Sequence, residues 1–220
     1  MRKIFESELT QLGIDLTDMS RQVEVAISHA GTALLTGDLK LAESVIVGDE
    51  AIDASERDID TRCVQLIAQQ APVATDLRVI VTALRMSATL ERMGDLARHL
   101  AEVTRRSYPR LAAPQAVSGT FTEMHAAATR VAQRTTTLLE THDLELATSI
   151  EHDDDLLDRL HEDTFTAVLG GNWNGSPQET VDTTLLSRYY ERFGDHAVSI
   201  ARRMVFLVTG EFIEDGTPGR

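Results

Sequence analysis

The stretch Glu91-Arg92-Met93-Gly94-Asp95 returns 100 residues later as Glu191-Arg192-Phe193-Gly194-Asp195. A second set of matches, which begins at Asp38 and Asp143, recurs at an offset of 105 residues. Matches at two consistent offsets indicate an internal repeat, in which one structural unit occurs twice. The small difference between the offsets indicates a shorter connection in the second copy.

Three long segments in each copy carry apolar residues at three- and four-residue spacings. This is the pattern of an amphipathic helix that buries one face. Gly37-Asp38, Pro72 and the loop 170–177 separate the segments, because glycine and proline interrupt helices. The expected helices cover residues 4–36, 39–70, 75–106, 120–141, 144–169 and 178–209. The sequence therefore predicts an all-α protein made of two pseudo-symmetric three-helix bundles.

A stretch near residues 108–118, which contains Pro109 and Pro114 and is followed by Gly119, connects the two copies. We interpret this stretch as a linker. One unit is then expected at residues 1–109 and the other at 117–210. The tail from Gly210 to Arg220 is expected to be loose, as chain ends often are when nothing holds them.

Composition limits the possible classes of function. The net charge of −14 argues against a nucleic-acid-binding protein, because neutralising phosphates requires an excess of Lys and Arg. It argues equally against binding an anionic membrane by charge alone. No segment approaches the roughly 18 apolar residues of a membrane-spanning helix, and Cys63 is the only cysteine, which excludes an intrachain disulfide. We expect a cytoplasmic, soluble protein that meets membranes only through its partners.

Carboxylates recur in pairs that are four residues apart. The pairs are Asp49/Asp53, Glu91/Asp95, Asp154/Asp158 and Glu191/Asp195. Residues at this spacing lie on one face of a helix, one turn apart. In an antiparallel helical hairpin, residues equally far from the turn lie at the same level, and the pairs of each copy are centred on Pro72 and on Asn174-Gly175. Each copy can therefore bring four carboxylates together on neighbouring helices.

Clusters of carboxylate oxygens suit hard cations such as Mg, Ca, Mn or iron. Carboxylates one turn apart repel each other, which a sequence tolerates more easily when a cation lies between them. The alternative is an ordinary acidic surface whose charges pair with Arg85, Arg92, Arg188 and Arg192. The repetition of the pattern favours metal. Gly94 and Gly194 lie within expected helices, where glycine costs about 1 kcal/mol relative to alanine, so a close approach of backbone or ligand would explain both.

At these residues the sequence resembles the PhoU family of phosphate-specific transport accessory proteins, and the similarity covers nearly the whole chain. It rests on both Glu-Arg-x-Gly-Asp segments and on three further motifs. These are Phe5-x-x-Glu8-Leu9-x-x-Leu12, Val45-Ile46-x-x-Asp49-x-x-Ile52-Asp53 and Pro72-x-Ala74-x-Asp76-Leu77-Arg78. The abundance of Ala, Thr and Arg makes the chain look like the actinobacterial, PhoY-like branch of the family.

The resemblance implies two three-helix bundles with metal ions on the paired acidic motifs, the metal being open among Fe, Zn, Mn and Mg. It also implies a homodimer that restrains phosphate uptake and represses phosphate-starvation genes. Its partners would be PstB, the ATPase of the phosphate ABC transporter, and the sensor histidine kinase PhoR. The second copy leaves an alternative open, because Glu151/Asp155 also has the spacing of a ligand pair.

Two other classes of function compete with a non-enzymatic regulator. The first is a metalloenzyme, such as a phosphohydrolase or oxidase, that works through carboxylate-bound metal. The second is a purely structural helical bundle. No nucleophile with a neighbouring base and no cofactor-binding loop stands out in the sequence, so we favour the regulator and expect no catalytic residues.

Overall fold

A computed structural model describes residues 2–211 of the chain, and within this range the fold is entirely helical. Six long helices occur: α1 (Arg2–Thr36), α2 (Leu39–Gln70), α3 (Ala74–Ser107), α4 (Ser118–Thr141), α5 (Glu145–Leu169) and α6 (Pro177–Thr209). A short 3-10 helix, η1 (Gln115–Val117), precedes α4. The predicted all-α fold is confirmed. Most of the tail predicted to be loose, residues 212–220, lies outside the described residues.

The helices end where the sequence provides suitable termini. Gly37 and Gly210 adopt positive φ angles of 69° and 81° after α1 and α6, a conformation that glycine reaches without steric cost. Asp38 caps α2 by accepting a hydrogen bond from the Leu41 backbone N–H at 3.0 Å. Ser176 and Glu179 form a reciprocal capping box at the start of α6.

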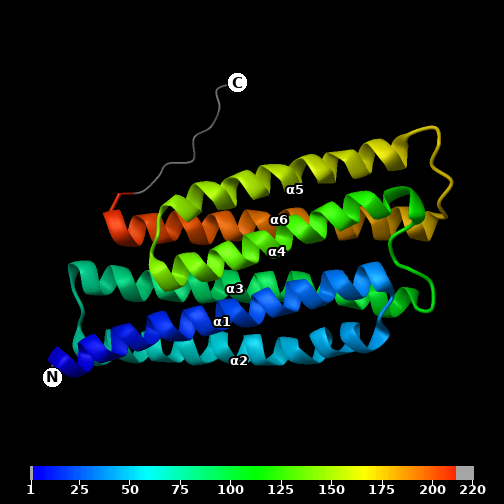
Figure 1. Cartoon of the computed structure of the whole chain (residues 1–220). Helices are drawn as coiled ribbons and strands as arrows, with labels where there is room; N and C mark the ends of the chain where they lie inside the picture. Colours follow the sequence, from blue (N-terminus) through cyan, green and yellow to red (C-terminus); the bar gives the residue numbers. More distant parts are fainter. Residues whose placement is uncertain (1, 212–220) are drawn as a thin grey trace.

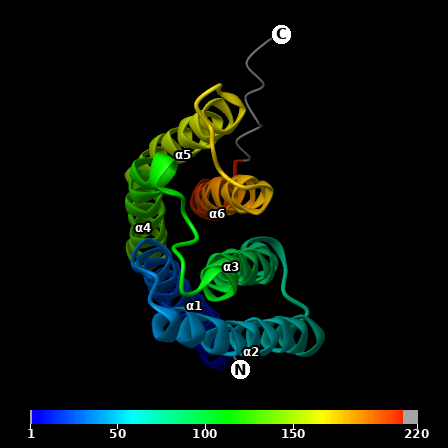
Figure 2. The same ribbon diagram turned by 90° about the vertical axis from the view of Figure 1, so that its right-hand side faces the viewer.

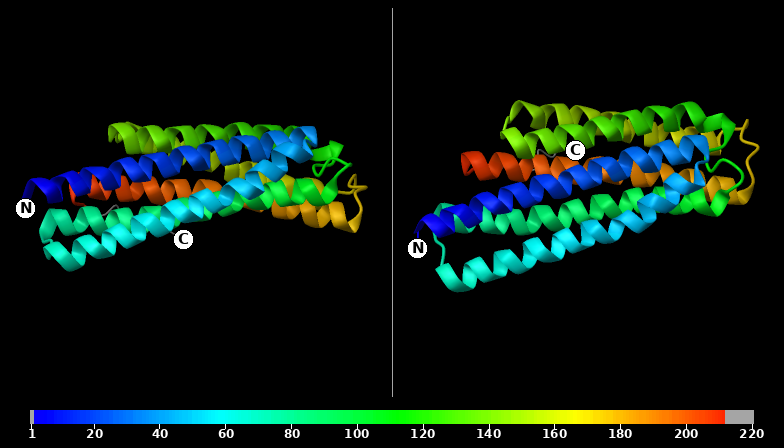
Figure 3. Two further views of the ribbon diagram at one scale, coloured as in Figure 1. Left: turned by 90° about the horizontal axis from the view of Figure 1, so that it is seen from below. Right: turned by 60° about the horizontal axis from the view of Figure 1, so that its bottom comes forward.

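The long axes of the six helices are roughly aligned with one another (Figures 1 and 3). Seen end-on, α2, α1, α4 and α5 form a curved outer layer, and α3 and α6 lie side by side on its inner side (Figure 2). Each three-helix unit contributes one helix to the inner layer. The unit boundary therefore lies between α1 and α4 in the outer layer and between α3 and α6 in the inner one.

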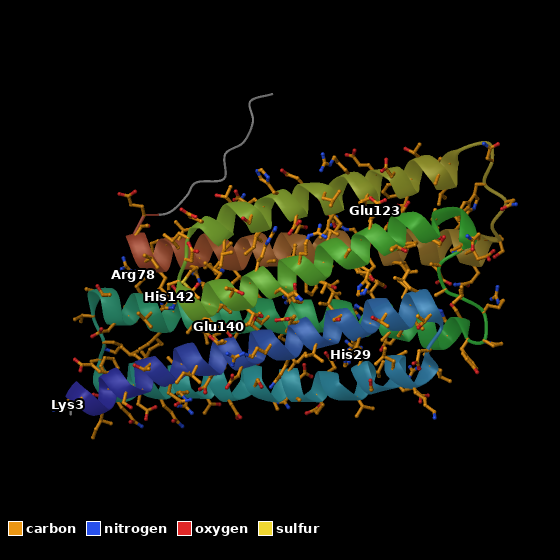
Figure 4. The ribbon with its side chains drawn as sticks, in the orientation of Figure 1. Lys3, His29, Arg78, Glu123, Glu140 and His142 are labelled. Atoms are coloured by element: carbon orange, nitrogen blue, oxygen red, sulfur yellow. The ribbon has the colours of Figure 1, made fainter. Side chains whose placement is uncertain are left out.

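One apolar core extends through both units. On α1 the buried residues follow the three- and four-residue spacing, as Leu16, Met19 and Val23 illustrate. Polar contacts also join α1 to α4. The hydroxyl groups of Ser20 and Thr136 are hydrogen-bonded at 3.0 Å, and Arg21 pairs with Glu140. Figure 4 labels Glu140 on α4 where that helix passes α1. The units are thus packed into one body, although each repeats the same chain path.

The inner helices α3 and α6 are antiparallel. The His99 ring of α3 lies 5.2 Å from the Tyr189 ring of α6, and Arg106 near the end of α3 pairs with Asp182 near the start of α6 at 2.5 Å.

No helix within residues 2–211 is long and apolar enough to cross a membrane. The exact limits of the two units, 1–109 and 117–210, stay a prediction.

Candidate functional site

The first carboxylate cluster lies between α2 and α3. Asp49 and Asp53 come from α2, and Glu91 and Asp95 come from α3. Burial is the main cause that raises the pKa of Asp49 and of Glu91, and negative charges on the neighbouring helix raise both further. The four acids are therefore close enough to repel one another, as the spacing of the hairpin predicts.

Gly94 allows the two helices of this unit to approach closely. A methyl group at this position would lie 3.0 Å from Ile52 Cδ1 and 3.4 Å from Asp49 Oδ1. A larger residue would therefore require the buried Ile52 to shift by a few tenths of an ångström. The close neighbours of Gly94 are side chains of α2, where the sequence suggested backbone or a ligand.

Arg98 occupies the centre of the first cluster. Its guanidinium Nε lies 2.6 Å from Asp49 Oδ2, and its terminal nitrogens pair with Asp95 and, at 2.9 Å, with Glu102. Asp49 is only 8% exposed, so this ion pair offsets the cost of burying its charge. Arg92 is exposed, and its charge offsets part of the rise in the pKa of Glu91.

The outer part of the first cluster is an open polar depression of about 330 Å³. Asp53 and Glu91 line it together with Glu56, Arg57 and Arg92. The three carboxylates offer oxygen atoms that could hold a hydrated cation, and the two arginines supply part of the balancing positive charge. The first unit thus combines an inner part that an arginine neutralises with an outer part that remains open.

The second cluster lies between α5 and α6 and contains Asp154, Asp158, Glu191 and Asp195. Burial raises the pKa of Asp154 to about 7, and repulsion from Asp158 and Asp195 adds to this effect. Burial also raises the pKa of Asp158 and that of Glu191. The acids of the second unit therefore lie together as those of the first do.

Two carboxylate oxygens of the second cluster are buried and have no hydrogen-bond partner within residues 2–211. They are Asp154 Oδ1 and Glu191 Oε2. The other oxygen of Glu191 accepts from Arg188 on the same helix. Gly194 is again the point of closest approach, because a methyl group there would overlap Asp154 Oδ1 and lie 3.0 Å from Leu157 Cδ1.

The alternative pair Glu151/Asp155 is differently placed. Glu151 Oε1 lies 3.7 Å from Arg202 Nε, and Asp155 is exposed. Asp153, between them, is the buried acid of this run and pairs with Arg130 at 3.1 Å and with Arg134. The geometry favours Asp154/Asp158 as the pair that faces α6.

The two clusters differ in how they fit a metal ion. Within residues 2–211, no group of three or more His, Cys, Asp or Glu side chains already has the arrangement that holds a metal. Buried, unpaired oxygens are nevertheless costly unless a cation or donor satisfies them. Asp154 and Glu191 provide such oxygens, so the second cluster fits a hard cation after small side-chain movements.

Sequence reasoning missed the role of Arg98 and the burial of Asp153. A signal for Arg98 was present, because it follows Asp95 by three residues and so lies on the same helix face. Asp153 could not be singled out from the sequence. The five consecutive polar residues 151–155 cover all sides of the helix over slightly more than one turn, so their spacing does not show which one is buried.

Comparison with known proteins identifies relatives over the whole length. The family model for the PhoU domain matches residues 16–104 and again residues 121–204. The phosphate-specific transport system accessory protein PhoU homolog 2 of Mycobacterium tuberculosis is 42% identical over 212 residues, which covers 96% of this chain and 100% of the relative. PhoU homolog 1 of Mycobacterium leprae is 40% identical and covers 100% of this chain and 99% of the relative.

Two crystal structures have the same fold. The phosphate transport system regulatory protein PhoU from Streptococcus pneumoniae superposes with a TM-score of 0.84 at 25% identity, covering 96% of this chain and 99% of that one. PhoU from Pseudomonas aeruginosa superposes with a TM-score of 0.83 at 27% identity, covering 94% and 100%. The match extends over both units in each case.

Proposed function

The chain belongs to the PhoU family, and we propose that it is a regulator of phosphate homeostasis that restrains phosphate uptake and the phosphate-starvation response. The observation that carries this proposal is the full-length match to PhoU accessory proteins, in which both repeats are covered. PhoU accessory proteins are a regulatory, non-enzymatic family. We therefore favour the regulator over the metalloenzyme.

In this proposal the protein links the transporter ATPase PstB to the sensor kinase PhoR at the cytoplasmic side of the membrane. Long helices with polar outer faces provide the surface, since helix-in-groove and helix-on-helix docking requires no dedicated pocket. The net charge of −14 favours partner surfaces that are basic. We further propose that the protein acts as a homodimer.

Metal ions on the carboxylate clusters form the second part of the proposal. Asp154, Asp158, Glu191 and Asp195 would hold one ion or a small group of ions, and Asp53 and Glu91 with Asp49 and Asp95 the other. A bound divalent cation would neutralise charges that now repel across each helical hairpin, and so tie α2 to α3 and α5 to α6. The metal would be Fe, Zn, Mn or Mg.

A reporter strain tests the regulatory proposal. The gene is deleted together with any paralogue, and expression of a phosphate-starvation promoter is measured in phosphate-rich medium. We expect strong derepression that the wild-type gene reverses. Unchanged reporter output in the deletion strain would refute the proposal. Affinity purification from phosphate-replete cells would then show whether PstB or PhoR is retained.

A further inference from the structure

A cavity of about 370 Å³ opens between α3 and α6, away from both carboxylate clusters. It lies at the end of the molecule where α3 begins and α6 ends, near Arg78 in Figure 4. Its lining consists of Ala74, Leu77, Arg78, Val81, Thr82, Arg85, Arg203 and Phe206. Three of these residues are arginines and none is acidic, in a chain whose net charge is −14.

Two of the three arginines of this cavity are under-satisfied. Among residues 2–211, the buried Nε atoms of Arg78 and Arg203 have no hydrogen-bond partner, whereas Arg85 is exposed. Burial lowers the pKa of Arg203, and the like charge of Arg85 lowers it further, which places these two guanidinium groups close together. A folded protein keeps unpaired, mutually repelling cations at a cost, which a bound anion would offset.

The opposite end of the same helix pair provides an internal comparison. The repeat offset of 100 residues places Asp182 where the cavity has Thr82, and Gln178 where it has Arg78. At that end Asp182 accepts hydrogen bonds from Arg106 at 2.5 Å and from Gln178 at 3.0 Å. At one end of the inner layer an acid therefore neutralises Arg106, whereas at the other end the part of the chain that the structure describes lines the cavity with three arginines and no acid.

Other features of the cavity suit an anion with an attached apolar part. Ala74 belongs to the lining and starts α3, whose positive dipole end is not capped by a side chain of Val73. The guanidinium carbon of Arg78 lies 5.6 Å from the centre of the Phe206 ring, which fixes the orientation of this arginine. Leu77 and Val81 add apolar surface beside the charges.

We propose that this cavity, formed by Arg78, Arg85, Arg203 and Thr82, binds a multiply charged phosphate or pyrophosphate group carried by a small ligand. Guanidinium groups donate paired hydrogen bonds that match the oxygens of phosphate. Three positive charges balance the two to three negative charges of such groups better than a monovalent carboxylate would. The volume lies in the range of about 300–1,000 Å³ that small-molecule sites occupy. The site does not depend on the metal clusters.

Titration calorimetry on the full chain, freed of metal with a chelator and kept at low salt, tests the site. The probes are sodium phosphate, sodium pyrophosphate and ATP, and sodium sulfate is the control for charge. We expect pyrophosphate to bind more tightly than sulfate. The double variant Arg85→Gln/Arg203→Gln should weaken this binding at least about tenfold, since direct hydrogen bonds to charged groups are lost.

Arg106→Gln is the matched control, because it removes an arginine of the same helix pair that Asp182 already neutralises. It should leave pyrophosphate binding within about twofold, as rim charges outside a site contribute little. The double variant should also melt at or above the wild-type temperature, because repulsion between Arg85 and Arg203 disappears. Tighter binding of ATP than of pyrophosphate would identify a phosphate ester as the ligand class, and the reverse order an inorganic ion.

Three results would overturn the proposal. They are no binding of any phosphate probe at millimolar concentration, unchanged binding in the double variant, and an equal loss in Arg106→Gln. Binding to phosphatidylglycerol vesicles without binding to the soluble probes would also contradict it, and would indicate a membrane surface instead.

Discussion

The two carboxylate clusters share their four acidic positions but differ in the cation that accompanies them. In the first unit Arg98 lies among Asp49, Asp95 and Glu102. In the second unit, 100 residues later, the corresponding residue is Val198. The second unit has Arg188, which pairs with Glu191 of the cluster, and Arg202, which pairs at 3.7 Å with Glu151 outside it.

This difference changes the electrostatics of sites that look alike in sequence. Arg98 offsets part of the burial cost of Asp49, whereas Asp154 has a buried oxygen without a partner and a pKa raised to about 7. A repeated motif therefore does not guarantee two equivalent sites. Each cluster contains one arginine, but Arg98 pairs with the buried Asp49 of the first, whereas Arg188 pairs with Glu191 of the second and leaves Asp154 for another cation to neutralise.

The largest effect should come from metal binding. In wild-type protein, Mn²⁺ at about 100 times its dissociation constant should add roughly 2.7 kcal/mol to the free energy of unfolding, or about 5–10 °C in melting temperature. Asp154→Asn/Glu191→Gln should lose most of this gain, because the two carboxylate charges that would hold the ion are removed. Asp49→Asn/Glu91→Gln is the matched variant of the first unit and should lose less. Thermal melting with elemental analysis measures both variants. If they lose the same amount of stabilisation by Mn²⁺, the two clusters do not differ in metal binding.

The next effect concerns pH in the metal-free protein. The pKa of Asp154 is about 7 in the folded protein and its ordinary value is 3.8, so the folded state holds more protons between these values. The stability that Asp154 contributes should therefore be fully present below about pH 4 and should fall as pH rises towards 7, by about 2 kcal/mol once solvent screening is allowed for. Urea unfolding of Asp154→Asn should show a flatter pH profile. A profile as steep as that of wild type would contradict this origin.

Replacing Arg98, the arginine of the first cluster, should have a moderate effect on the free energy of unfolding. Arg98→Gln leaves the buried Asp49 without its partner and should lower the free energy of unfolding by about 2 kcal/mol, below the range for fully buried pairs. Asp49→Asn/Arg98→Gln should cost less than the two single changes together, because the residues are coupled. Arg92→Gln, one position after Glu91 and exposed, is the control and should change stability by less than about 0.5 kcal/mol. Additive losses in chemical denaturation would argue against the coupling.

The smallest effect should come from the helix termini. Ser176→Ala removes the capping box of α6 and should cost about 1 kcal/mol. Val73→Ala, at the same position before α3, has no side-chain cap to lose and should be nearly neutral. Thermal melting of both variants measures the difference. A comparable loss in the two would show that the caps do not distinguish the units.

Much of the architecture is determined locally and can be read in the sequence. The apolar spacing predicts all six helices, because burying one face requires a period close to the helical repeat. Their ends agree within a few residues, since Gly37, Pro72 and Pro177 mark positions where a helix cannot easily continue. The two Glu-Arg-x-Gly-Asp segments predict both the repeat and the closeness of the acids, because an antiparallel hairpin fixes which residues lie level.

Only the tertiary structure decided which charges are satisfied. The pairing of Arg98 with Asp49 and of Arg106 with Asp182 joins residues that are far apart in the chain, so no local pattern selects these partners over Arg92 or Arg188. The cavity between α3 and α6 likewise depends on how the two units pack. Helix formation is governed by neighbours within a few residues, whereas the burial and pairing of a charge depend on whatever the whole fold brings within a few ångströms of it.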